Sequence, residues 1–575
     1  MKKELGHFVA RLHRAGRSCW AVACLSLLSA LTAGAGAISN GMALSFPEVI
    51  EATSSGGSTY YVSTTGSDSH TGLSRQQAWH TIQHAVDTIP EGSTIVVLAG
   101  TYDGARIEHA GTVTGPKILR TDTGAKVLIN TPGPKNKHGS LLEIETWEGD
   151  GVVSYWTVQG FTMTAASFSG VDVRGSDVSF NHHIVVRGNQ VHDSGKTGIF
   201  MAFTNDSLIE GNDSYDNGEH GIYYNNSGDR TTIRGNRLHH NASCGLHMNG
   251  DASMGGDGVI SECLIEANMI YENGTGGSAI NLDGVTHSVI RNNLLYAAHA
   301  SGISLYRIDA RECSHDNQVL NNTILVASNG RWAVNLPDPG CTGNRFFNNI
   351  LYNYHSWHGC IIINESNLEG FASDYNVVMN RFSTDPENDT VITFAAWQAV
   401  GFDAHSFLAT PDQLFIDPAT VDFHLNQDSP AMDTGKALTT VTADLEGVPR
   451  PKGAGFDIGA YETYKPIISL TATDPRAFEA GPTRGIVAVV RTGAMNRPLV
   501  VRYKVAGTAG NGIDYLPLSG KVTIKAGAST ARLRVTPVDD AGQEGTETVR
   551  ITGIGSTKYE LGLPKTAIVT ITDND

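Results

Sequence analysis

The sequence predicts an all-β protein whose central part is a parallel β-helix solenoid. Three observations predict it: an asparagine that recurs at regular spacing, a short β-branched run before each asparagine, and a second apolar run later in each repeat. The asparagines recur every 23 to 32 residues, at Asn189, Asn212, Asn236, Asn268, Asn293, Asn322 and Asn349. A period of this length indicates a solenoid. Between Arg187 and Val334 no repeat has room for the amphipathic helix that an α/β repeat requires.

Each repeat contains a strand, an asparagine turn, a polar link, a small residue and a second strand. Leu208-Ile209 is a first strand, and Gly221-Ile222 opens a second one. We expect the asparagines to form a hydrogen-bonded stack inside the turns. The charges two residues before them alternate in sign and should form exposed ion pairs with a structural role. These residues are Arg187, Glu210, Arg234, Glu266 and Arg291.

The first 37 residues predict an export signal. Lys2 and Lys3, with three arginines, form a basic start, residues 19–31 are mostly apolar, and Ala35-Gly36-Ala37 is a small-residue cleavage site. The apolar run is too short to span a membrane, and no later stretch reaches the length that a span needs. We therefore expect a secreted protein without a membrane span after signal removal. It would be extracellular or associated with the cell surface or matrix, with the periplasm as the alternative compartment.

The chain is acidic, with a formal net charge of −17. The signal segment holds five basic residues and one acidic residue, so the remaining chain is more acidic still. Nucleic acid is therefore excluded as a partner, because its phosphates require a basic surface. A polyanionic glycan would be repelled unless cations or local arginines intervene. Calcium binding would explain the excess of carboxylates in an exported protein.

Five cysteines remain after signal removal, which are too few for a disulfide scaffold. Export permits pairing, and two candidate pairs are Cys244 with Cys263 and Cys313 with Cys341. Each pair could staple an insertion loop. No cysteines have CxxC spacing, which argues against a zinc or redox site.

Residues 58–110 are expected to form an N-terminal cap and the first rungs, and residues 111–363 the rest of the β-helix. Tyr61-Val62-Ser63, Gly66-Ser67-Asp68, Thr81-Ile82-Gln83-His84-Ala85-Val86 and Ala99-Gly100-Thr101-Tyr102 resemble the entry segment of exported right-handed β-helix proteins, including family-nine pectate lyases. The resemblance implies a right-handed helix and a polysaccharide as the class of substrate. Residues 364–463 form an irregular segment and a closing module, which resembles the C-terminal end of such proteins in motifs such as Phe456-Asp457-Ile458-Gly459.

Residues 465–575 predict a separate β-sandwich of seven strands. Phe478-Glu479-Ala480-Gly481, Gly512-Ile513-Asp514-Tyr515, Pro537-Val538-Asp539-Asp540, Glu544-Gly545-Thr546-Glu547 and Ile571-Thr572-Asp573-Asn574-Asp575 resemble the Calx-β domain, an immunoglobulin-like sandwich. The resemblance implies a calcium site made of loop carboxylates at one end of the sandwich. The ligands that it implies are Glu479, Asp514, Asp539, Asp540, Glu544, Asp573 and Asp575.

The second strands of successive rungs predict two outward rows of side chains, because alternate residues of a strand face opposite sides. The first row is Phe200, Tyr223, His247, Asn281, Ser304 and Asn335. The second row is Ala202, Asn225, Asn249, Asp283 and Tyr306. Insertions follow this strand at residues 251–263 and 307–316. We expect both to rise beside the same sheet and to wall a groove.

A proton-abstracting reaction on a uronic acid needs a base near the sugar C5 and a group that neutralises the carboxylate. His247 or Tyr223 is a candidate base, and Lys196 is an alternative one, because lysine has that role in family-nine pectate lyases. Arg307, or calcium on Asp283 or Asp309, is a candidate neutralising group. Substrate-binding side chains would be Asn225, Asn249, Asn281, Asp283 and Tyr306.

Two functions remain open at this stage. The first is a calcium-assisted polysaccharide lyase or C5-acting enzyme on a uronate-containing glycan, and the second is a non-catalytic polysaccharide-binding, matrix or adhesion protein. The Asn-Thr-Asp, Gly-Asp-Asp and Gly-His-Gly motifs of β-helix polygalacturonases are absent from the sequence, as is the Asp-Pro-His motif of mannuronan epimerases. These absences argue against hydrolysis of the polygalacturonase type and leave the catalytic residues without a motif.

Overall fold

The computed structural model describes residues 56–146, 151–274, 276–481, 483–493, 495, 498–556 and 558–575. The expected export signal, residues 1–37, lies outside these ranges. Within them, no helix is both long enough and apolar enough to cross a membrane.

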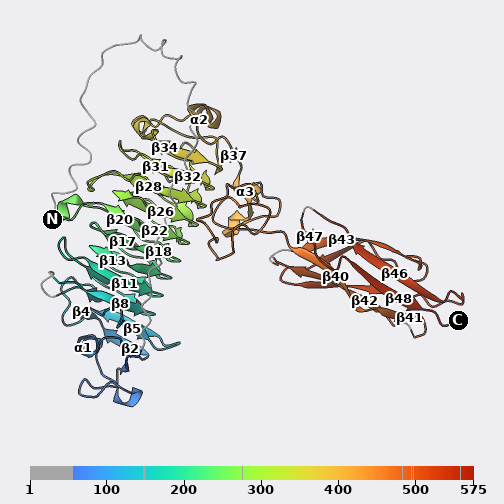
Figure 1. The fold of residues 1–575 in the computed structure, drawn as a ribbon, viewed down its shortest axis with the longest axis horizontal. Helices are drawn as coiled ribbons and strands as arrows, with labels where there is room; N and C mark the ends of the chain where they lie inside the picture. Colours follow the sequence, from blue (N-terminus) through green and yellow to red (C-terminus); the bar gives the residue numbers. More distant parts are fainter. Residues whose placement is uncertain are drawn as a thin grey trace, which may run out of the picture. The chain divides into compact units, whose positions relative to one another are not determined.

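Three parallel sheets stack rung upon rung to form the β-helix, which confirms the predicted fold (Figure 1). The ten-stranded sheet carries the two predicted rows. Its strands are β4 (Ala105–Ile107), β7 (Leu142–Ile144), β10 (Ser169–Arg174), β13 (Thr197–Ala202), β17 (Ile222–Asn225), β20 (Leu246–Asn249), β24 (Ile280–Asp283), β28 (Ile303–Tyr306), β31 (Val334–Leu336) and β34 (Ile361–Ile363).

The thirteen-stranded sheet contains the strands that precede the repeat asparagines. They are β1 (Thr59–Val62), β2 (Thr94–Val97), β5 (Lys117–Thr121), β8 (Ser154–Gln159), β11 (Asn181–Arg187), β14 (Thr204–Asn205), β15 (Leu208–Glu210), β18 (Thr232–Arg234), β22 (Leu264–Glu266), β26 (Val289–Arg291), β29 (Gln318–Leu320), β32 (Arg345–Phe347) and β35 (Ala372–Asp374).

The twelve-stranded sheet closes the cross-section. Its strands are β3 (Gly100–Asp103), β6 (Val127–Thr131), β9 (Thr162–Thr164), β12 (Gln190–His192), β16 (Asp213–Tyr215), β19 (Arg237–His239), β23 (Met269–Tyr271), β27 (Leu294–Ala298), β30 (Thr323–Val326), β33 (Ile350–Asn353), β36 (Val377–Val378) and β37 (Phe407–Leu408). A two-stranded sheet, β21 (Ile260–Ser261) and β25 (Val285–Thr286), joins the first insertion to the next rung.

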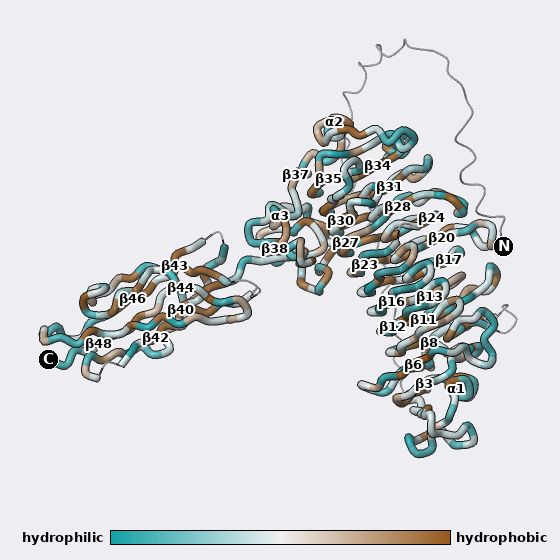
Figure 2. Tube along the Cα trace, turned by 180° about the vertical axis from the view of Figure 1, so that it is seen from behind, coloured by the Kyte–Doolittle hydropathy of each residue, from teal (hydrophilic) through white to brown (hydrophobic). Residues whose placement is uncertain are grey.

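Inward side chains of all three sheets form one continuous apolar core along the β-helix. Figure 2 shows hydrophobic stretches in brown in successive rungs. At the N-terminal end, α1 (Ile82–Thr88) packs its apolar face on this core, and the Thr81 hydroxyl caps it by accepting from the His84 N–H at 3.1 Å. The helix thereby covers the open end of the solenoid, where core residues would otherwise meet water.

The repeat asparagines form the expected stack. Asn268, for example, is fully buried, and its Oδ1 accepts from both the backbone N–H and the Nδ2 of Asn236 at 3.0 Å. Its Nδ2 donates to the Ile233 carbonyl at 2.9 Å and to Asn293 Oδ1 at 3.0 Å. The Asn268 side chain thus satisfies backbone groups of the preceding rung and bonds to the asparagine of the following one.

The outer charges next to this stack pair as predicted. Glu210 contacts Arg187 and Arg234 at 2.6 Å each, and Arg291 contacts Glu266 at 2.7 Å. All of these side chains remain partly exposed, so each pair contributes little to stability. The ladder has the structural role expected from the sequence.

The closing module packs on the last rungs. It contains α2 (Phe394–Val400), α3 (Pro411–Leu414) and the antiparallel pair β38 (Phe415–Asp417) and β39 (Asp422–Leu425). The buried Arg450 and Glu462 pair at 2.8 Å. Asp457 accepts backbone N–H bonds from Asp433 and Thr463. These carboxylates therefore organise turns.

The C-terminal domain is a sandwich of two sheets, as predicted. One sheet has the order β45 (Thr530–Val535), β42 (Gly485–Thr492), β40 (Ile467–Asp474) and β47 (Glu560–Leu561). The other has the order β41 (Arg476–Phe478), β48 (Thr566–Thr572), β46 (Thr546–Gly553), β43 (Leu499–Gly507) and β44 (Lys521–Ile524). Residues of both sheets form a separate apolar core.

Candidate functional site

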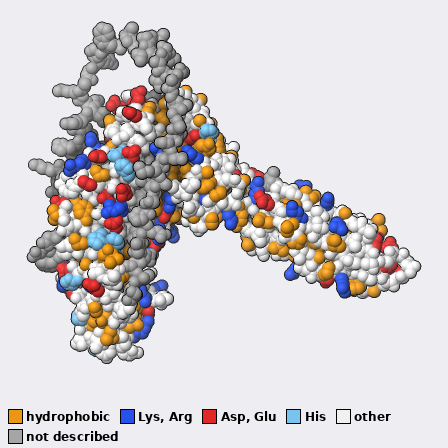
Figure 3. Space-filling view, in the orientation of Figure 1, with side chains coloured by type: hydrophobic (Ala, Val, Ile, Leu, Met, Phe, Trp, Pro, Cys, Tyr) orange, Lys and Arg blue, Asp and Glu red, His pale blue; other side chains and the backbone are white. Residues whose placement is uncertain are grey.

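Strand register places the predicted side chains in two straight rows on the outer face of the ten-stranded sheet. Tyr223 lies beside His247, and His247 beside Asn281, in the first row. Asn249 lies beside Asp283 in the second row, and Asp283 beside Tyr306. In Figure 3, histidine side chains, in pale blue, gather at several places on the β-helix. Both rows follow from the alternation of the strands.

Two neutral imidazoles lie together at the centre of the first row. The rings of His220 and His247 are 4.9 Å apart, and Tyr223 stacks on His247 at 4.8 Å. Burial lowers the pKa of His247 to about 3, and the positive charge of His220 acts in the same direction. Burial and then Lys196 lower the pKa of His220 to about 4. Both rings are therefore uncharged near neutral pH.

Hydrogen bonds fix the tautomer of both rings. Asn281 Nδ2 donates to His247 Nδ1 at 3.0 Å, and the backbone N–H of Cys244 donates to His220 Nδ1 at 3.3 Å. With Nδ1 as acceptor, each neutral ring carries its proton on Nε2 and offers a hydrogen-bond donor. To act as a base through Nδ1, His247 would first have to give up the bond from Asn281.

The two tyrosine hydroxyls add further donors. Tyr223 Oη accepts from Asn249 Nδ2 at 3.3 Å, and Tyr306 Oη accepts from Asn281 Nδ2 at 2.6 Å. Burial raises the pKa of Tyr223 to about 12 and also raises the pKa of Tyr306. Both hydroxyls therefore keep their protons, which they can donate to a ligand.

Side chains of the second row are largely buried, and two of them bond to the backbone of the insertions. Asp283 is buried and accepts from the backbone N–H groups of Ile308 and Asp309 at 2.9 Å each. Asn249 is also buried, and its Oδ1 accepts from the Asp251 N–H at 3.1 Å. Both side chains thus cap the start of an insertion. Asn225 is buried too, and its Oδ1 has no hydrogen-bond partner.

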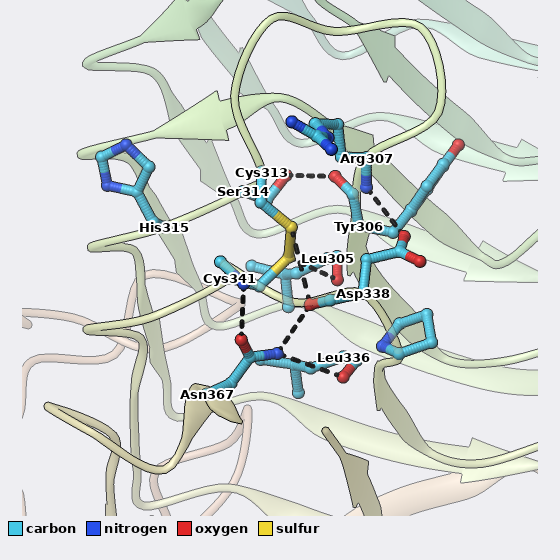
Figure 4. The surroundings of a disulfide bond; sticks show 12 residues. Leu305, Tyr306, Arg307, Cys313, Ser314, His315, Leu336, Asp338, Cys341 and Asn367 are labelled. Carbon is cyan, nitrogen blue, oxygen red and sulfur yellow. Dashed lines mark hydrogen bonds between the residues drawn. A yellow bond between two sulfur atoms is a disulfide. The ribbon is translucent and has the colours of Figure 1, made fainter. Parts of the chain in front are cut away.

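The insertions join into one wall beside this face. The Ala252 N–H donates to the Asp309 carbonyl at 2.9 Å, and the Arg311 N–H donates to the Gly258 carbonyl at 3.0 Å. A disulfide between Cys313 and Cys341 ties the second insertion to the next rung (Figure 4). Loops that bond to one another on a rigid sheet are suited to hold a ligand in place.

The other expected cysteine pair does not form. Cys313–Cys341 is a disulfide, but Cys244 and Cys263 are buried free thiols. Cys244 lies in the turn before β20, whereas Cys263 lies before β22, in a different sheet. The prediction for this pair was wrong because the two thiols lie just before strands that belong to different sheets.

The remaining candidate catalytic residues lie at opposite edges of the face. Lys196 lies just before β13 and forms an exposed ion pair with Glu219, the residue before His220. Arg307 follows β28 and is exposed, and its backbone N–H donates to Asp338 at 3.0 Å. Lys196 and its partner Glu219 are therefore charged groups that act on the imidazole pair, and Arg307 belongs to the wall.

Acidic side chains gather at the end of the C-terminal domain that carries the C-terminus (Figure 3). Carboxylate oxygens of Asp514, Glu544 and Glu547 lie within 4.8 Å of one another. The charge of Asp514 raises the pKa of Glu544; burial, and then Asp514, raise the pKa of Glu547 to about 7. Such a cluster of hard oxygen donors with excess negative charge fits a calcium ion.

The other implied ligands surround this cluster in different ways. Asp573 accepts from the backbone N–H groups of Glu544, Gly545 and Asp575 at 2.7 to 2.9 Å, and these bonds lower its pKa to about 2. Asp573 thus shapes the loop. The pKa of Glu479 is raised by burial and by the neighbouring carboxylates, which include Asp573, Asp540 and Asp539.

Sequence reasoning missed two members of these sites. His220 was not among the candidate residues, although its place immediately before Gly221-Ile222 puts it at the entry of β17. Glu547 belongs to a motif used to identify the domain, but it was not among the ligands that the resemblance implied. It is the second residue of β46, close enough to the start of the strand to reach the loop cluster.

Comparisons with known proteins agree with this architecture. Residues 148–274 match the family described as right handed beta helix region, and residues 465–575 match the Calx-beta domain. No curated protein matches the chain.

Three solved structures illustrate the similarity. Pectate lyase Pel9A is 14% identical with a TM-score of 0.49, covering 70% of this chain and 96% of its own. The mannuronan C-5 epimerase AlgE6 A-module of Azotobacter vinelandii is 14% identical with a TM-score of 0.36, covering 62% and 90%. The apo-form Calx CBD1 domain is 26% identical with a TM-score of 0.17, covering 20% and 100%. At these values the similarities do not indicate what the chain acts on.

Proposed function

From a chain that contains a right-handed β-helix region and a C-terminal Calx-β domain, we propose a calcium-binding protein that holds an extracellular polysaccharide on the outer face of its ten-stranded sheet. The observation that carries this proposal is the row of Tyr223, His247 and Asn281, beside the wall made by the two insertions. The row presents uncharged donors, which suit the hydroxyl and carboxylate oxygens of sugars.

Binding without chemistry fits the charge state of the row better than proton abstraction does. A general base works best with a pKa near the operating pH, whereas the pKa of His247 is about 3 and that of Tyr223 about 12. Lys196 is held by Glu219. The protein would then act in a matrix or in adhesion, as the second sequence hypothesis stated.

A lyase or C5-acting enzyme on a uronate-containing glycan is the second candidate. It is favoured by the convergence of Lys196, His220 and Tyr223 at one place on the face: Lys196 acts electrostatically on His220, and the His220 ring lies 5.2 Å from Tyr223. If a ligand displaced Glu219, Lys196 would become available as a base, with Arg307 or calcium balancing the uronate charge.

One set of measurements separates the two candidates. Affinity electrophoresis against uronate and neutral polysaccharides, with calcium and with chelator, measures retention; ultraviolet absorbance of an unsaturated product measures elimination. We expect retention that Tyr223→Ala and His247→Ala both weaken, with no product. Product formation that Lys196→Ala abolishes would replace the binding function by the lyase. No retention and no product would contradict both.

Calcium binding by the C-terminal domain has its own test. Calorimetry on the whole protein should show calcium heat, and calcium should raise the melting temperature of the sandwich, because a ligand that binds only the folded state stabilises it. The absence of both effects would contradict the proposal for Glu479, Asp514, Glu544 and their neighbours.

A further inference from the structure

The first row does not stay accessible along the whole sheet. Tyr223, His247, Asn281 and Asn335 are partly exposed, and the small Ser304 between the last two is buried. Phe200, the next member toward the N-terminal end, is also buried, as is Ile362, which is in register after Asn335. The accessible members extend from β17 to β31, which is four rung spacings, or about 19 Å. The face therefore has a limited length, and its N-terminal limit lies at β13.

A stacked arginine forms that limit. The Arg174 guanidinium lies over the ring of Phe168 at 5.0 Å and over the ring of Phe200 at 4.6 Å. Its Nε contacts Asp172 Oδ1 at 2.8 Å, which fixes its orientation. Phe168 also contacts Phe200 edge to face at 5.6 Å. Cation–π contacts and a paired charge together make a firm barrier across both rows.

Behind this barrier the sheet face is filled by paired charges. Arg106 and Glu143 are in register on β4 and β7, both are buried, and their side chains pair at 3.3 Å. The backbone N–H groups of Lys137 and His138 donate to Glu143 at 2.8 Å each, so the preceding loop covers the row. Among the described residues, the first row is therefore buried at every strand from β13 back to β4.

We infer that the face recognises the end of a polysaccharide chain, with the terminal sugar against the barrier of Phe168, Arg174 and Phe200. This inference rests on the proposed glycan-binding function and specifies its ligand. The wall of insertions limits the face along one side, and the barrier limits it at one end. A chain that lies along the row with its end at Tyr223 cannot continue toward the N-terminal strands, because Arg174 and Phe200 lie in its way.

The length dependence of binding by the unmodified protein tests this inference. Polygalacturonate, alginate and laminarin, each fractionated into oligomers of defined length, are titrated by calorimetry. End recognition predicts that affinity per chain end stays constant, so that affinity per unit mass halves with each doubling of chain length. Affinity per unit mass that does not fall with length would overturn the inference but leave glycan binding intact. No binding to any of the three would overturn both.

Borohydride reduction identifies which end is recognised. It converts only the reducing sugar, so loss of binding assigns that end, and unchanged binding with the same length dependence assigns the other end; both outcomes support end recognition.

Variants at the barrier provide a second test. Phe168→Ala removes one face of the Arg174 stack and should raise the affinity for long chains relative to short oligomers. Phe347→Ala is the matched control, because Phe347 lies on β32 in the thirteen-stranded sheet and also has a cation over its ring, Lys436 at 3.9 Å. We expect the control to keep the length dependence of the unmodified protein. An unchanged length dependence in Phe168→Ala would overturn the assignment of this barrier.

Discussion

Replacing Asn268 by alanine tests the physical basis of the β-helix itself. The side chain is fully buried and makes four hydrogen bonds, two accepted from Asn236 and two donated to Ile233 and Asn293. All four partner groups belong to neighbouring rungs, three to the preceding rung and one to the following rung. The substitution therefore removes contacts on both sides of one rung without changing the outer face.

The size of the loss in the free energy of unfolding follows from those contacts. Each intramolecular hydrogen bond contributes about 1 kcal/mol net, and a buried group left without a partner costs about 1–3 kcal/mol. The Asn236 backbone N–H loses its side-chain acceptor, whereas Asn236 Nδ2 keeps its bond to the Ile209 carbonyl. We therefore expect the free energy of unfolding to fall by about 2–4 kcal/mol. The upper value corresponds to loss of all four bonds and the lower value to loss of only some of them.

Denaturant unfolding followed by far-ultraviolet circular dichroism measures this loss. Asn329→Ala is the matched control, because Asn329 is exposed and its Oδ1 contacts only His299, at 2.8 Å; it should change stability by less than about 0.5 kcal/mol. Asn268→Asp keeps both acceptor contacts but places a charge in the core, so it should destabilise at least as much as alanine. A loss in Asn268→Ala no greater than in the control would refute the reasoning.

Three further predictions concern the site, the wall and the metal. Because the folded pKa values of His247 and His220, about 3 and 4, lie below the ordinary value of 6.5, the unfolded chain binds more protons in acid. The contribution of these two groups to stability should be constant above pH 6.5 and fall as the pH drops toward 4 and then 3. His247→Gln should reduce that fall in thermal melts, and an equal fall would contradict the assigned burial. Cys313→Ser removes a cross-link with a sequence separation of 28 and should cost about 3–4 kcal/mol, with no such loss in Cys244→Ser if Cys244 is a free thiol. Glu547→Gln should weaken calcium binding by about tenfold in calorimetry and Asp539→Asn by less, since only Glu547 belongs to the tight cluster; the reverse order would contradict that assignment.

The sequence alone determined the repeat and its consequences. The asparagine spacing gave the solenoid, and strand alternation then placed Tyr223, His247 and Asn281 in one row. These predictions succeeded because each depends on contacts between equivalent positions of adjacent rungs, which a regular period repeats. The loop motifs of residues 465–575 similarly identified the sandwich, since its strands alternate clearly.

Only the tertiary structure decided how the rows are used. Asn249 and Asp283 accept hydrogen bonds from the backbone of the insertions. Cys244 and Cys263 are unpaired. Arg174 lies over Phe200 at the end of the face. The tertiary structure also holds His247 uncharged and brings Glu547 to Asp514. Each of these outcomes depends on where an irregular loop folds back or how deeply a side chain is buried. Such contacts join residues without a repeating relation in the sequence, so no period predicts them.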